Sequence, residues 1–245
     1  MNRRAFLALA ATAAVLPRAT ELLAAQDARL SARSTGPKER IAPGLHKLGL
    51  GEDRDGVLYV PKSYQPDKPM PLAIMLHGAG NRAQGMEYTH ALGEEFGVIL
   101  LVPDSRNPRT WDALLGAFGS DVQFIDAALA YTFARCAIDT KRLAVGGFSD
   151  GASYALSLGL GNGDVFSRII AFSPGFIPPV TMRGKPRVFV SHGTQDQVLP
   201  IDDTSRRIVP GLKARGYDVT YREFEGPHRV PPTIARDGFE WFVRG

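Results

Sequence analysis

The chain has 245 residues, 44% of them hydrophobic and 22% charged, a composition typical of one soluble globular domain with a substantial core. Its formal net charge is +4, and the first 40 residues account for all of this excess, because they carry seven basic residues against three acidic ones. The rest of the chain is formally neutral and lacks the clustered positive charge that nucleic-acid binding needs, so we expect no nucleic-acid partner.

Residues 1–25 are predicted to be an export signal. Arg3 and Arg4 precede an apolar run over residues 5–16, which is shorter than the ~20 apolar residues that a membrane span needs. The paired arginines resemble the twin-arginine signal of bacteria, whose cargo is exported already folded. We therefore expect a periplasmic or extracellular protein without a stable membrane span. Two alternatives stay open: retention of the segment as an uncleaved anchor, and an amphipathic helix of the mature domain.

The rest of the chain is predicted to divide into a polar, arginine-rich linker over 26–40 and one catalytic domain over 41–245. Its one cysteine, Cys136, cannot form an intramolecular disulfide. Cys136 ends an apolar helical pattern, so we expect it to be a small buried hydrophobe rather than a nucleophile.

Apolar runs alternate with helical patterns throughout the predicted domain. We expect strands at 56–60, 72–77, 98–102, 142–147, 168–173, 187–192 and 218–224. We expect helices at 83–96, 121–135, 151–160, 203–215 and 231–243. Several strands are apolar throughout, as in sheets covered by helices on both faces. The pattern predicts an α/β fold with a doubly wound, mostly parallel sheet, whose active site lies at the carboxyl ends of the strands.

One of these strands runs into Gly147-Phe148-Ser149-Asp150-Gly151, a G-x-S-x-G motif that a helix follows at once. In this strand–turn–helix context the motif predicts a nucleophilic serine, Ser149. The turn has to be so tight that side chains at the two flanking positions would collide, which is why both are glycine. The positive end of the following helix would face the oxyanion that forms during attack.

A loop of small residues at 77–81 directly follows another strand. Such a loop lets backbone amides approach a substrate carbonyl closely, and we expect the amides of Ala79 and Asp150 to form an oxyanion hole, with Gly78 beside the substrate. His77 precedes the serine in the chain and is expected to brace this loop rather than to act as the base.

The acid and the base are expected to follow later strands. Asp196 lies in a short loop after the strand at 187–192, and the acids just beyond it are expected to begin the next helix. His228 lies between the last strand and the last helix, and is the predicted base. The chain order Ser149, Asp196, His228 is the order typical of this kind of site. His192, in the same strand-end turn as the acid, is expected to be structural.

These motifs resemble the α/β-hydrolase superfamily from about Val57 to the C-terminus. Within it they resemble the phospholipase/carboxylesterase and polyhydroxybutyrate-depolymerase/feruloyl-esterase-like group of small esterases. The segments that carry the resemblance are 76–81, 121–126, 138–142, 147–151, His192-Gly193-Thr194-x-Asp196 and Gly226-x-His228. The resemblance implies a serine hydrolase that cleaves small carboxylic esters through an acyl-enzyme, with no cofactor and no metal. Asp150 and Ala152 depart from the residues that many relatives have there, which bears on substrate preference.

The predicted fold is minimal, because the connection between the strands ending at 173 and starting at 187 leaves no room for a cap domain. We therefore expect an open site walled by aromatic residues that could equally belong to the core: Trp111, Phe118, Phe148 and Phe176. A peptidase or thioesterase with the same triad stays open as an alternative, as does a non-catalytic binding protein on this fold. The sequence carries no signal for a particular oligomeric state.

Overall fold

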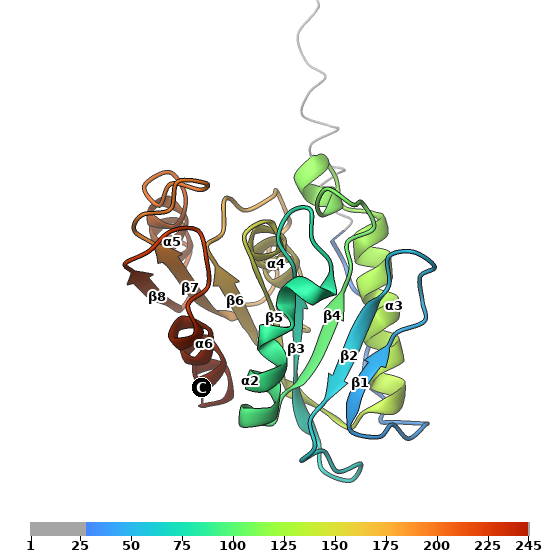
Figure 1. The fold of residues 1–245 in the computed structure, drawn as a ribbon. Coiled ribbons are helices and arrows are strands. Elements are labelled where there is room, and N and C mark those ends of the chain that lie inside the picture. Colours follow the sequence, from blue (N-terminus) through green and yellow to red (C-terminus); the bar gives the residue numbers. More distant parts are fainter. Residues whose placement is uncertain (1–27, 245) are drawn as a thin grey trace, which may run out of the picture.

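The computed structural model describes residues 28–244 (Figure 1). The predicted export signal, residues 1–25, lies outside the described residues. Within them one sheet forms with the strand order β1-β2-β4-β3-β5-β6-β7-β8. Its strands are β1 (Gly44–Lys47), β2 (Gly56–Val60), β3 (Met70–Leu76), β4 (Ile99–Pro103), β5 (Ile138–Phe148), β6 (Arg168–Phe172), β7 (Arg187–Gly193) and β8 (Val219–Phe224). The first two strands pair antiparallel, β2 also pairs antiparallel with β4, and the remaining pairs are parallel.

Helices cover both faces of this sheet. They are α2 (Tyr88–Phe96), α3 (Ser120–Arg135), α4 (Asp150–Gly161), α5 (Ser205–Ala214) and α6 (Pro232–Arg244), with 3₁₀ turns η1 (Ala83–Met86) and η2 (Asp112–Leu115). Figure 1 shows α2 and α6 on one face and α3, α4 and α5 on the other. This arrangement confirms the predicted α/β fold with a doubly wound, mostly parallel sheet.

The central strand β3 shows why the sheet needs cover on both faces. Leu72, Ile74 and Leu76 belong to the apolar cluster under α3, α4 and α5, whereas Ala73 and Met75 belong to the cluster under α2 and α6. Successive side chains of a strand point to opposite faces, so an entirely apolar strand is stable only between two layers of helices. Burial of one such leucine or isoleucine contributes about 2 kcal/mol.

The strands depart most from the sequence-based expectation at β1 and at the start of β5. The edge strand β1 was not expected, because its four residues alternate between half-buried and exposed and carry little apolar signal. β5 begins at Ile138, four residues earlier than expected. Residues 139–142 of this strand are polar and mostly exposed. The start of the strand joins the sheet through pairing of the buried Ile138 with Met70, next to an irregularity in register.

The described part of the predicted linker packs against the domain. Leu30 is buried, and Asn162 at the end of α4 accepts the Leu30 amide at 2.9 Å and donates to the carbonyl two residues earlier at 2.6 Å. Arg29 forms an ion pair with Asp164 at 2.6 Å. Residues 28–33 are therefore part of the packed structure. A single buried leucine between Arg29 and Arg33 leaves no periodic signal in the sequence, which is why the segment resembles a polar linker.

The connection between β6 and β7, residues 174–186, forms neither helix nor strand. It runs from the carboxyl end of β6 to the amino end of β7, at the opposite edge of the sheet, without adding a cap. Among the helices of residues 28–244, none combines the length and apolarity needed to cross a bilayer.

Candidate active site

Ser149 lies at the sharp turn between β5 and α4. Its backbone has φ 58° and ψ −121°, a conformation that side-chain-bearing residues rarely adopt and that stores strain. The surrounding structure holds this turn, because the Ser149 amide donates to the carbonyl of Phe172 at 2.9 Å and its own carbonyl accepts the amides of Ala152 and Ser153 at 3.0 Å. The side chain is thereby presented at the carboxyl edge of the sheet, with 8% of the residue exposed.

The flanking glycines are required by close backbone contacts. A Cβ at Gly147 would lie 2.5 Å from the carbonyl oxygen of Leu76, and a Cβ at Gly151 would lie 2.5 Å from the carbonyl oxygen of His77 and closer still to that of Leu76. Both positions are therefore pressed against the end of β3. This contact brings the turn at Ser149 and the loop that follows β3 next to each other.

Three side chains from three separate loops meet at this edge. His228 Nε2 lies 2.9 Å from Ser149 Oγ, and His228 Nδ1 lies 2.5 Å from Asp196 Oδ2. Burial alone would raise the pKa of Asp196, but hydrogen bonds from the Leu199 amide and from His228 hold it below its usual value. The ionised carboxylate therefore accepts a hydrogen bond from Nδ1–H of His228, which leaves Nε2 unprotonated and able to accept a hydrogen bond from the serine hydroxyl. The structure thus brings Ser149, Asp196 and His228 together in the order that the sequence predicts.

A second histidine contacts the same carboxylate. His192 is fully buried, and its Nε2 lies 3.1 Å from Asp196 Oδ2 and 2.8 Å from the carbonyl of Leu199. Its Nδ1 lies 2.7 Å from Ser205 Oγ. Burial lowers the pKa of His192, so the ring is neutral. Two acceptors face Nε2, so Nε2 carries the proton and the Ser205 hydroxyl donates to Nδ1.

The sequence predicts a structural role for His192 but does not indicate its contact with Asp196. The four-residue spacing between the two, across a turn at the end of a strand, is the signal that could have indicated it. The remaining oxygen of the carboxylate, Oδ1, accepts the amides of Val198 and Leu199 at 2.9 and 2.8 Å. The orientation of the carboxylate is therefore determined from both sides.

The predicted oxyanion donors lie on the two elements that meet at Ser149. Asp150 is the first residue of α4, where backbone amides lack an acceptor within the helix. Its carboxylate accepts a hydrogen bond from the hydroxyl of Thr110 at 2.5 Å. On the other element, a Cβ at Gly78 would lie 3.4 Å from the Cβ of Ser149, so the loop that contains Ala79 passes directly beside the serine.

His77 braces this loop from inside the protein. The ring is fully buried, its Nδ1 donates to the carbonyl of Gly78 at 2.8 Å, and its Nε2 accepts the amide of Ser105 at 3.0 Å. Burial lowers the pKa of His77, so the imidazole is neutral, as this pair of contacts requires. His77 does not contact Asp196 or Ser149 in the way that His228 does.

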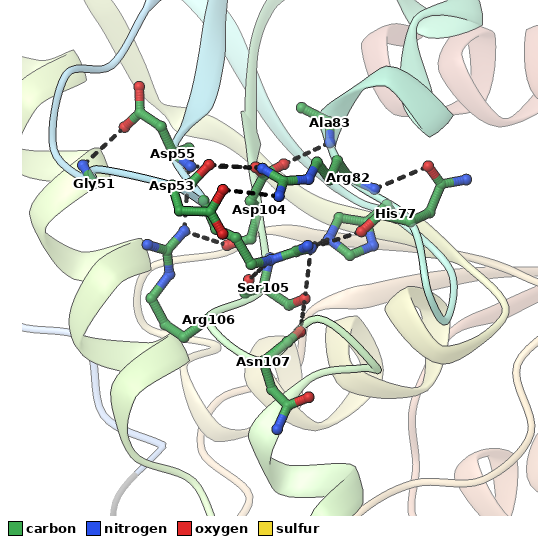
Figure 2. A network of polar contacts seen from close by, with 12 residues as sticks. Gly51, Asp53, Asp55, His77, Arg82, Ala83, Asp104, Ser105, Arg106 and Asn107 are labelled. Atoms are coloured by element: carbon green, nitrogen blue, oxygen red, sulfur yellow. Dashed lines mark hydrogen bonds and ion pairs between the residues drawn. The ribbon is translucent and has the colours of Figure 1, made fainter.

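Next to His77 lies a polar network that joins three loops at the carboxyl edge (Figure 2). Asp104, at the end of β4, accepts the amide of Ala83 at 2.6 Å and that of Asp55 at 3.2 Å. Arg82 lies 3.1 Å from Asp53 and 3.6 Å from Asp104. The network therefore ties the turn before β2 to the segments that follow β3 and β4.

The four aromatic residues predicted to wall the site differ in burial: two lie in the core and two have exposed surface. Trp111 is fully buried, donates from Nε1 to the carbonyl of His77 at 2.9 Å and packs against Tyr154, as the buried Phe118 also does. These two side chains belong to the core. Phe148 is half-buried and its ring lies 4.7 Å from that of His228, centroid to centroid. Phe176, on the connection after β6, is 49% exposed.

Cys136 is buried at the end of α3, and burial raises the pKa of its thiol to about 12. It lies outside the site, in agreement with its predicted structural role.

The family model described as phospholipase/carboxylesterase matches residues 113–237, about half of the chain. A probable feruloyl esterase C of Aspergillus flavus is 27% identical over 176 residues, which cover 68% of this chain and 63% of that protein. A bifunctional acetylxylan esterase/xylanase of Neocallimastix patriciarum is 28% identical over 162 residues, which cover 63% of this chain and 23% of that protein. The chain thus spans less than two thirds of the length of these relatives.

Solved structures share the fold at lower identity. An S-formylglutathione hydrolase from Staphylococcus aureus superposes with a TM-score of 0.66 at 15% identity, covering 84% of this chain and 99% of the other. A ferulic acid esterase from Anaeromyces mucronatus superposes with a TM-score of 0.61 at 19% identity, covering 86% and 93%.

Proposed function

The chain belongs to the phospholipase/carboxylesterase family of α/β-hydrolases, and on that premise we propose that it hydrolyses carboxylic esters through an acyl-enzyme on Ser149. The observation that carries the proposal is the continuous series of contacts from Ser149 through His228 to Asp196, at 2.9 and 2.5 Å. Nucleophilic acyl transfer needs a hydroxyl within hydrogen-bonding reach of a base, and a third group that orients the base.

The reaction proposed for this site has two steps. In the first, His228 Nε2 takes the proton of Ser149 as Oγ attacks the ester carbonyl, and then gives that proton to the departing alcohol oxygen, which leaves the acyl-enzyme. In the second, His228 takes a proton from water, the resulting hydroxide attacks the acyl carbon, and the proton returns to Ser149 Oγ as the acid departs. Asp196 stays ionised throughout and stabilises the imidazolium that forms in each step.

We propose that the amides of Ala79 and Asp150 stabilise the oxyanion of each tetrahedral intermediate. A donor aimed at such an oxyanion is worth about 3 kcal/mol, or roughly a hundredfold in kcat. The start of α4 adds the positive end of its dipole at the same place.

For the substrate we propose an ester with an aromatic acyl group, of the feruloyl kind named for the relatives. The half-buried ring of Phe148, 4.7 Å from that of His228, supports this choice because it offers a face on which an aromatic acid can stack. We propose that Phe176, which is 49% exposed on the connection after β6, adds a second aromatic surface. Kinetics with methyl ferulate, p-nitrophenyl acetate, an acyl thioester and an acyl p-nitroanilide would rank the ester against the thioesterase and peptidase alternatives. Faster turnover of the thioester or the anilide than of both esters would overturn the assignment.

Labelling by a fluorophosphonate probe tests the nucleophile directly. We expect wild-type protein to be labelled and to hydrolyse p-nitrophenyl acetate, and Ser149→Ala to lose both properties while staying folded. The matched control is Ser157→Ala, which removes a buried hydroxyl from the same helix, where it donates to the carbonyl of Pro178 at 2.5 Å. Absence of labelling in well-folded wild-type protein would refute the proposal and favour a binding protein.

We further propose that residues 1–25 direct export of the folded domain. Expression of the full chain in a bacterium with a twin-arginine pathway, beside a variant with both Arg3→Lys and Arg4→Lys, tests this. We expect the wild type outside the cytoplasm and the variant retained in it. Equal export of both would contradict a twin-arginine signal.

A further inference from the structure

Arg54 is a buried arginine that lies at the candidate active site. The other side chains of the site follow parallel strands, whereas Arg54 comes before the first parallel strand in the chain. It stands just before β2, and only 7% of it is exposed. Because β2 pairs antiparallel with β4, the start of β2 lies at the carboxyl end of β4, with Gly56 opposite Pro103. The turn that holds Arg54 therefore reaches the edge of the sheet at which the loop after β3 also lies.

The guanidinium group of Arg54 contacts both ends of the loop at 77–81. Its Nη2 donates to the carbonyl of Asn81 at 2.6 Å and lies 3.4 Å from Nε2 of His77. The same nitrogen lies 3.2 Å from the hydroxyl of Ser105, and Nε donates to the carbonyl of Ser105. Arginine suits this place because its planar fork serves several acceptors at once, whereas lysine carries a single compact charge.

These two contact points control one peptide group of the loop. The carbonyl oxygen of Gly78 accepts hydrogen bonds from His77 Nδ1 at 2.8 Å and from the amide of Asn81 at 3.3 Å. In a planar trans peptide the carbonyl of one residue and the amide of the next point in opposite directions. Whatever holds the oxygen of Gly78 therefore sets the direction of the N–H of Ala79.

We infer that Arg54 is a positioning residue that fixes the peptide plane between Gly78 and Ala79, and so aims the Ala79 amide as an oxyanion donor. Arg54 acts through the His77 ring and the Asn81 backbone, the two groups that hold the Gly78 oxygen. The inference rests on the proposed function insofar as it assigns the Ala79 amide to an oxyanion.

Loss of Arg54 is expected to affect the transition state more than the bound substrate. Arg54→Met replaces the guanidinium group by an apolar side chain of similar length. In this variant the peptide plane between Gly78 and Ala79 can rotate, and the Ala79 amide turns away from the oxyanion. One fully lost donor costs about 10²-fold to 10³-fold in kcat, so a partly populated rotation should lower kcat by roughly 10-fold to 100-fold with KM within about twofold. The affinity of a trifluoromethyl ketone, which forms a tetrahedral adduct, should fall by the same factor as kcat/KM.

Arg106→Met is the matched control. Arg106 belongs to the same network in Figure 2, but its Nη2 donates to the carbonyls of Asp104 at 2.8 Å and of Asp55 at 3.5 Å rather than to the loop at 77–81. We expect this variant to lose thermal stability while keeping kcat within about threefold, since the loss of a hydrogen bond away from the reacting atoms affects folding alone.

Hydrogen exchange provides a readout that does not depend on turnover. Amides in a peptide covering 77–82 should exchange at least about tenfold faster in Arg54→Met than in wild type, and at the wild-type rate in Arg106→Met. If Arg54→Met exchanges faster but the wild type is inactive and is not labelled by the fluorophosphonate, the proposed function is refuted while the loop-positioning role is supported. Wild-type kcat and exchange in folded Arg54→Met would overturn the inference, as would equal losses in both variants.

If Arg54→Met does not fold, Arg54→Lys takes its place. Its ammonium group can reach one end of the loop but not both, so we expect a smaller fall in kcat with KM unchanged. Wild-type kcat together with wild-type exchange in Arg54→Lys would overturn the inference.

Discussion

Substitution of Gly151 by alanine tests whether close contact between the start of α4 and the end of β3 sets the catalytic geometry. The new Cβ would lie 2.5 Å from the carbonyl oxygen of His77 and closer still to that of Leu76, and both are backbone atoms that cannot rotate away. Ordinary contact needs ~3.5 Å, so the start of α4 has to move by about 1 Å. That displacement carries the Asp150 amide and Ser149 away from the loop after β3.

The expected effects follow from this displacement. Overpacking should lower the free energy of unfolding by about 1–3 kcal/mol. A misplacement of about 1 Å in the reacting groups should lower kcat by roughly 100-fold. Urea denaturation gives the first quantity, and hydrolysis of p-nitrophenyl acetate under saturating conditions gives the second.

Gly159→Ala, on the same helix, separates the two effects. Its Cβ would lie 2.5 Å from a side-chain carbon of Ile169 in the core, far along α4 from the serine. We expect a comparable loss of stability with kcat within about threefold of wild type, because side-chain repacking can absorb this overlap. Wild-type kcat in folded Gly151→Ala, or an equal loss of kcat in Gly159→Ala, would refute the reasoning.

Three further predictions concern single contacts. His192→Leu should lower kcat by about 10-fold to 100-fold, and His192→Gln should recover part of the lost kcat. If His192→Leu causes no further loss in an Asp196→Ala background, His192 acts through Asp196. Additive losses of kcat in this double-mutant cycle would contradict that coupling. Trp111→Phe leaves a buried carbonyl without its donor and should cost about 1–3 kcal/mol in urea denaturation, and an unchanged stability would contradict the contact. The hydrogen bond from Arg29 lowers the pKa of Asp164 to about 2, so its stabilisation is present above the usual pKa of 3.8 and is lost as the pH falls from there toward 2. Because Asp164 is 44% exposed, solvent screening keeps the difference between wild type and Asp164→Asn below about 1 kcal/mol at pH 6, and this difference should vanish as the pH falls through about 2.

The sequence could predict most of the fold because the fold depends on local periodicity. Apolar runs such as β3 and β6 are continuous, since both of their faces are covered, and each contrasts with the helical pattern that follows it. The exceptions have little periodicity: β1 is four half-exposed residues, and the packed segment at 28–33 has a single deeply buried leucine flanked by arginines.

The candidate site likewise has residues that the sequence could predict and supporting contacts that it could not. The sequence alone indicated the candidate catalytic residues, because a serine between two glycines, a strand-end aspartate and a histidine before the last helix are recognisable from neighbours along the chain. The tertiary structure alone decided which groups support them. The contact of His192 with Asp196 depends on how a turn closes, and the contact of Arg54 with the loop at 77–81 depends on how β2 pairs with β4.

The same distinction holds for the aromatic residues. Trp111 and Phe148 are both large rings near the active-site edge, yet one is fully buried under the loop after β3 and the other lies against His228 with part of its surface exposed. Residue type determines how favourable burial would be, but only packing among elements far apart in the chain determines which ring is covered.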